Sequence, residues 1–150
     1  MTIYTDTSIL GSAYLRDEVN SAWTTEVELT GTDPVVTSQL TDVEMAGLFR
    51  RAHDDGRVTE PEMHSLLRRY ATDTADDGPI AVLKLTPALL QRAVGLILRV
   101  GARSPDVIHL AAAAQLGEQT GESVALLTAD IRQARAARTL GLPLHPRSPG

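Results

Sequence analysis

Four acidic residues of this chain stand where carboxylates could act together. Asp6 ends an apolar run, Glu44 lies near the start of an expected helix, Asp106 follows a Ser-Pro pair, and Asp130 follows the run Val-Ala-Leu-Leu-Thr-Ala. Each position is the exit of an expected strand or the entrance of an expected helix. In an open α/β sheet, ligands bind beyond the carboxyl ends of the strands. We therefore expect the four carboxylates to converge and to form a cation site.

Taken singly, each acid also has an ordinary structural explanation. Asp6 can form a turn, Asp106 can favour the positive end of its helix, and Asp130 can be an N-cap. Glu44 can complete a Thr-x-x-Glu capping box with Thr41. Only their joint placement favours a shared site over four separate local roles. Among the four acids, Asp130 is expected to lie at the periphery of that site.

Glu44 indicates that the site needs a counter-charge. Its helical neighbours at three- and four-residue spacing are Leu40, Gly47 and Leu48, so its side chain is expected to face inward. Two carboxylates about 5 Å apart repel each other by roughly 3 kcal/mol at an effective dielectric constant near 20. The sole lysine, Lys84, is expected in the middle of a strand, which leaves a divalent cation as the simpler counter-charge.

The types of ligand and their neighbours predict the chemistry of the site. Oxygen ligands favour Mg²⁺ or Mn²⁺ over zinc, and the absence of Cys excludes thiolate ligands and disulfides. One or two such ions can activate water and stabilise the leaving oxygen of a phosphodiester. The hydroxyls of Ser8 and Thr128 are expected to orient a carboxylate or a bound water, with helix capping as the alternative. His109 is expected to pack beside the site rather than to act as a base or a ligand.

These residues must be positioned by alternating strands and helices. We expect strands at 3–6, 35–37, 80–85 and 124–128 and a short edge strand at 142–144, with helices between them. This alternation predicts an α/β fold whose central parallel sheet has about five short strands and helices on both faces. Thr59 and Glu62 predict a capping box at the start of one of these helices.

Length and composition predict one soluble domain. A chain of 150 residues suffices for a single core, which we expect over residues 1–145, followed by a short flexible tail over 146–150. The net charge of −5 argues against long-range attraction to a polyanion but leaves local contact with nucleic acid open. No apolar stretch approaches the length of a membrane span and no signal peptide precedes the first strand, so a cytoplasmic protein is expected.

In their order and spacing, the motifs resemble those of PIN domains, and more narrowly those of VapC-type toxins of toxin–antitoxin pairs. The resemblance covers essentially the whole chain. Its motifs are Asp-x-Ser from Asp6, Ser-x-Leu-Thr-x-x-Glu from Ser38 with a later Arg50, Asp-x-x-His-Leu-Ala from Asp106, and Thr-x-Asp from Thr128 with a later Gly141-Leu142.

The resemblance implies an endoribonuclease in which Asp6, Glu44, Asp106 and Asp130 hold Mg²⁺ or Mn²⁺. It also implies an RNA substrate, a homodimer, and inhibition by a cognate antitoxin whose tail occupies the active-site groove. An alternative remains open, namely a catalytically silent PIN-like module that binds RNA or a protein. Nucleotide-binding folds are disfavoured because no Gly-rich phosphate loop follows any expected strand.

Overall fold

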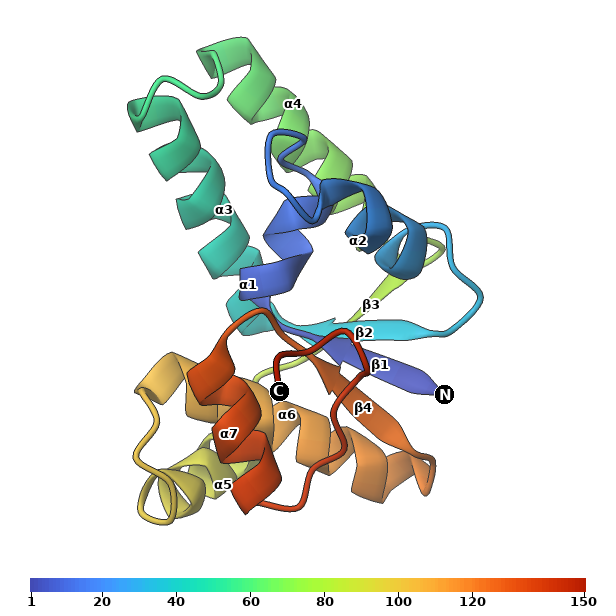
Figure 1. The fold of residues 1–150 in the computed structure, drawn as a ribbon, viewed down its shortest axis with the longest axis vertical. Coiled ribbons are helices and arrows are strands. Elements are labelled where there is room, and N and C mark those ends of the chain that lie inside the picture. Colours follow the sequence, from blue (N-terminus) through green and yellow to red (C-terminus); the bar gives the residue numbers. More distant parts are fainter.

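Four short parallel strands form the centre of the molecule in the computed structural model, which describes residues 1–150 (Figure 1). The strands are β1 (Thr2–Thr5), β2 (Val35–Ser38), β3 (Ile80–Leu83) and β4 (Val124–Leu127), in the order β3-β2-β1-β4. The predicted parallel α/β sheet is therefore confirmed, with four strands. The expected fifth strand is reduced to one parallel bridge between Leu126 and Leu144, beside Pro143, which has no N–H to extend a ladder.

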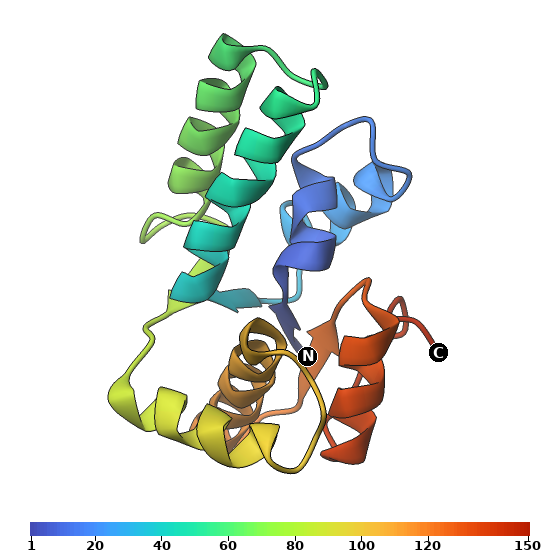
Figure 2. The same cartoon turned by 90° about the vertical axis from the view of Figure 1, so that its left-hand side faces the viewer.

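Helices cover both faces of this sheet, as Figures 1 and 2 show. One face carries α1 (Thr7–Leu10), which continues as a 3₁₀ turn (Gly11–Ala13), together with α2 (Ser21–Glu28), α3 (Gln39–Asp54) and α4 (Glu60–Asp73). The other face carries α5 (Pro87–Ile97), α6 (Ser104–Thr120) and α7 (Ile131–Thr139). None of these helices combines the length and apolar character needed to cross a membrane.

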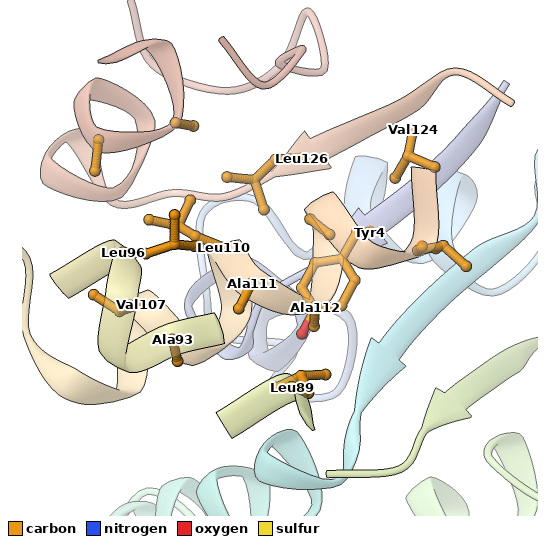
Figure 3. Close-up of a cluster of buried hydrophobic side chains, with 14 of the residues drawn as sticks. Tyr4, Leu89, Ala93, Leu96, Val107, Leu110, Ala111, Ala112, Val124 and Leu126 are labelled. Carbon is orange, nitrogen blue, oxygen red and sulfur yellow. The ribbon is translucent and has the colours of Figure 1, made fainter. Parts of the chain in front are cut away.

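Alternation along the strands creates two hydrophobic clusters, one on each side of the sheet. Ile3 and Leu127 belong to the cluster under α1, α3 and α4, whereas Tyr4 and Leu126 belong to the cluster under α5, α6 and α7. Figure 3 shows the second cluster, where the small side chains of α6, such as Ala111, lie beside Tyr4. Both faces of the sheet thus pack against hydrophobic clusters, in agreement with the wholly apolar sequences of β3 and β4.

A capping box marks the start of α4, but the box predicted for α3 is not formed. The predicted box at Thr59 and Glu62 is confirmed, since each backbone N–H donates to the other side chain at 3.3 Å. The box predicted at Thr41 and Glu44 is wrong, because α3 begins earlier, at Gln39, directly after β2. Thr41 is buried there and its hydroxyl lies 2.7 Å from that of Thr37. Glu44 consequently lies in the second turn of α3, where its carboxylate does not cap the helix.

Two further segments differ from the sequence-based expectation. Helix α2 was not predicted, because it buries Thr24 and Glu28 and therefore carries no apolar stripe. The tail, expected to be flexible, contacts the rest of the molecule. Ser148 donates to the Leu126 carbonyl at 3.0 Å and accepts from the Thr128 N–H at 3.2 Å. These contacts place the tail against the end of β4, next to the predicted site.

Candidate active site

One cavity of about 540 Å³, which we call the acid cavity, is lined by all four predicted acids. Asp6 follows β1, Glu44 lies on α3, Asp106 lies in the first turn of α6, and Asp130 precedes α7. These segments are distant in sequence but meet because β1 lies between β2 and β4 in a parallel sheet, so that the carboxyl ends of the strands share one edge. The structure therefore brings the four acids together.

Asp6 is the most buried of the four carboxylates, with only 4% of its surface exposed. Its Oδ1 accepts from the Ser8 hydroxyl at 2.5 Å and its Oδ2 accepts from the Thr128 hydroxyl at 2.6 Å. Burial raises the pKa of Asp6, and the charge of His109 and these two hydroxyls oppose the increase. Both hydroxyls thus orient a carboxylate, as the sequence predicts for Ser8 and Thr128.

Glu44 is held by a buried histidine. Its Oε1 accepts from the Thr7 hydroxyl at 2.9 Å and lies 2.7 Å from His109 Nε2, while His109 Nδ1 lies 2.9 Å from the Tyr4 hydroxyl. A carboxylate oxygen can only accept, so Nε2–H of His109 donates to Glu44, while the Tyr4 hydroxyl, whose pKa is raised by burial, pairs with Nδ1. His109 does pack beside the site, as expected, and it also fixes the position of the Glu44 carboxylate.

The ionisation of Glu44 follows from the same contacts. Partial burial works to raise its pKa, but the hydrogen bond and charge of His109, the Thr7 hydroxyl and the charge of Arg103 outweigh burial. The pKa of Glu44 therefore lies below its ordinary value, and its carboxylate is charged at neutral pH.

Asp106 and Asp130 lie at the starts of their helices. Asp106 Oδ2 is 3.4 Å from Arg103 Nε, and Asp130 Oδ1 accepts from the Arg132 N–H at 2.8 Å, which confirms Asp130 as an N-cap. The hydrogen bonds of Glu44, Asp106 and Asp130 each use one carboxylate oxygen. The second oxygen of each of these three acids has no protein donor and is available to a ligand.

The donor set fits a hard divalent cation in chemistry but not in spacing. All four acids offer oxygen, which Mg²⁺ and Mn²⁺ prefer. However, no group of three or more His, Cys, Asp or Glu side chains is arranged so that it could hold one metal ion. Shared ligation of an ion therefore requires the carboxylates to move closer together than they lie in this structure.

The cations near the acids were not found from the sequence. Arg51 and Arg103 line the acid cavity, so arginine provides the positive charge that was sought from lysine. Lys84 follows β3 instead of lying within it, and it lines a different cavity with Asp42. Arg51 lies on an expected helix and Arg103 directly before one, and nothing local distinguishes these two arginines from the solvated ones.

A fifth carboxylate lies behind Asp6 and was also missed. Glu28, at the end of α2, is 1% exposed; its Oε1 accepts from the Thr5 hydroxyl, and its Oε2 has no partner. Burial, and to a smaller extent the charge of Asp6, raise the pKa of Glu28 from 4.5 to about 8, against the effect of the Thr5 hydrogen bond. No apolar pattern around residue 28 indicates that this glutamate is inside.

Comparisons with known proteins agree with this architecture. The family model described as "PIN domain" matches residues 3–139. Among solved structures, the chain is similar to the crystal structure of Mycobacterium tuberculosis VapC20, which is described as a Sarcin-Ricin loop cleaving toxin. The two chains share 16% sequence identity over 90% of this chain and 95% of that chain, and their TM-score is 0.66. At this level of identity the similarity is one of fold. No curated protein matches this chain in sequence.

Proposed function

This chain belongs to the PIN domain family, and we propose that it is a metal-dependent endoribonuclease that acts as the toxin of a toxin–antitoxin pair. The observation that carries the proposal is the gathering of Asp6, Glu44, Asp106 and Asp130, from four separate segments, around one polar cavity. The fold that the chain shares with the toxin VapC20 supports RNA as the substrate.

In this proposal the four acids would hold Mg²⁺ or Mn²⁺, and such an ion, when bound, would supply an activated water and stabilise negative charge on the phosphate. The protein contributes the orientation of these ligands. Ser8 and Thr128 hold the Asp6 carboxylate, and His109 holds that of Glu44. The guanidinium groups of Arg51 and Arg103 line the same cavity and attract the phosphodiester.

The proposed partners follow from the same family resemblance. We propose that the chain forms a homodimer and that a cognate antitoxin inhibits it by inserting a segment into the acid cavity. Two arginines at the rim of that cavity would favour an acidic segment of the antitoxin.

Cleavage of RNA by the purified protein, freed of any partner, tests the proposal. We expect cleavage with Mg²⁺ or Mn²⁺ and its loss in Asp6→Asn, which removes one negative charge at nearly constant shape. Glu26→Gln is the matched control, since Glu26 is exposed and does not line the acid cavity. Undiminished cleavage by Asp6→Asn, or by the wild type in excess chelator, would contradict the metal mechanism.

A second candidate function is a catalytically silent module that binds RNA or a protein. One observation favours it, namely that no three potential ligands are arranged around a single ion. This candidate predicts that the wild type and Asp6→Asn bind RNA or a protein partner with the same affinity. It also predicts that neither protein cleaves RNA with any divalent ion.

A further inference from the structure

A second cavity, of about 390 Å³, adjoins the acid cavity. Its lining includes Arg99, Arg103, Arg132 and Arg135, and we call this space the arginine groove. Arg103 and Asp106 line both cavities, so the two spaces meet at these side chains.

Two neighbouring segments build the arginine groove. Arg132 and Arg135 are one helical turn apart on α7, and Thr139 continues the same face of that helix. Arg99 and Arg103 belong to the connection between α5 and α6, which lies beside α7 in both Figure 1 and Figure 2. The four arginines of the groove therefore come from two separate segments of the chain.

The charge of the groove is not compensated within its own lining. Four arginines and one acid, Asp106, give a local charge of +3 (4 − 1), although the whole chain carries −5. The side chains of Arg99, Arg132 and Arg135 form no ion pair. By contrast, Arg57 and Arg92 pair with carboxylates elsewhere on the surface. Like charges kept together without a counter-ion favour an anionic ligand.

We propose that the arginine groove binds the phosphate backbone of the RNA strand adjacent to the bond that is cut. This inference rests on the proposed nuclease function, because the groove joins the acid cavity at Arg103 and Asp106. Guanidinium groups bind phosphate oxygens in a bidentate manner. No aromatic side chain lines the groove, so bases are not stacked there, and the contact holds the strand without selecting its sequence.

Binding of a short oligouridylate in excess chelator, where no cleavage occurs, tests the groove directly. The groove variant is Arg132→Gln/Arg135→Gln, and the control is Arg16→Gln/Arg68→Gln, which removes the same charge from exposed arginines outside both cavities. Glutamine keeps the helix propensity of arginine, so α7 is preserved. We expect the groove variant to bind RNA about tenfold more weakly. We also expect the slope of log affinity against log salt to be less steep by about 1.4, or about 0.7 for each lost phosphate contact.

Three results would overturn the groove proposal. One is unchanged RNA affinity and salt slope in the groove variant, and another is an equal loss in the control variant. The third is binding of an oligoglutamate probe to the wild type but not to the groove variant, while the two proteins bind RNA with the same affinity. This result would assign the groove to an acidic protein segment. Circular dichroism and thermal unfolding verify that both variants are folded.

The assay separates this proposal from the proposed function. If the wild type cleaves no RNA with Mg²⁺ or Mn²⁺ and the groove variant still loses RNA affinity, the nuclease function fails and the groove stands. If the wild type cleaves RNA and the groove variant binds RNA as the wild type does, only the groove proposal fails.

Discussion

Asp6 shows how single side chains prepare this site, because both oxygens of a buried carboxylate accept hydroxyl hydrogen bonds. The two hydroxyls come from segments 120 residues apart, and they also lie 3.1 Å from each other. Removing either one takes away one of the two hydroxyl hydrogen bonds that orient the carboxylate.

We expect Ser8→Ala and Thr128→Ala each to lower RNA cleavage about 10- to 100-fold, the usual effect of losing a group that orients a metal ligand. Single-turnover cleavage rates with saturating Mg²⁺ or Mn²⁺ measure this loss. Ser65→Ala serves as the control, because Ser65 is exposed on α4. Cleavage by both variants at the wild-type rate would contradict the orienting role.

Glu28 makes the stability of the protein depend on pH. Its pKa in the folded state, about 8, lies above its ordinary value of 4.5, mainly because it is buried. The folded state therefore favours the protonated acid. Below pH 4.5 Glu28 is protonated in both states and imposes no penalty. Between about 4.5 and 8 the unfolded chain releases the proton first, so stability falls as pH rises.

We expect Glu28→Gln to remove most of this dependence. Relative to the variant, the wild type should lose up to about 1.4 kcal/mol of unfolding free energy per pH unit across that window. Urea unfolding at several pH values between 5 and 8 measures the difference. Parallel stability curves for the two proteins would show that Glu28 is ionised in the folded state as it is in the unfolded chain.

At the scale of elements, the C-terminal tail supports the end of β4. Ser148 accepts from the N–H of Thr128, whose hydroxyl in turn holds Asp6. The tail is also attached to α2, since the Arg147 guanidinium lies 5.1 Å from the centroid of the Trp23 ring. Residues 146–150 thus link the end of β4 to α2.

We expect Ser148→Ala to destabilise the protein by about 1 kcal/mol, because the Leu126 carbonyl and the Thr128 N–H both lose a partner. For a chain of this size the corresponding fall in Tm is roughly 2–4 °C. Differential scanning calorimetry of Ser148→Ala beside Ser65→Ala measures it. Equal Tm values for the two variants would show that the tail contributes nothing to stability.

For the whole molecule, a cation that binds only the folded state must raise the stability of the fold. At an ion concentration of about 100 times its Kd the gain is about 2.7 kcal/mol, which raises Tm by roughly 5–10 °C. We expect this rise with Mn²⁺ or Mg²⁺ for the wild type and for Glu26→Gln, but not for Asp6→Asn. An equal rise in all three proteins would place the ion outside the acid cavity.

Much of the fold follows from local patterns in the sequence. The apolar run before Asp6 and the Val-Ala-Leu-Leu run before Thr128 are strands, and the box at Thr59 starts a helix as predicted. The box at Thr41 fails although its local pattern is the same. Burial of Thr41 against Thr37 is a tertiary contact that overrides the local capping preference.

The candidate site divides in the same way. The identities of its acids, and the positions of Asp6, Asp106 and Asp130 at strand exits and helix starts, follow from the sequence because hydrophobic runs and caps depend on near neighbours in the chain. Which atoms meet was decided only by the tertiary structure. His109 contacts Glu44 across 65 residues, Glu28 contacts Thr5 across 23, and Ser148 contacts Thr128 across 20. Parallel strands need long crossover connections, so the residues that share a sheet edge come from distant segments, and no local pattern records their contacts.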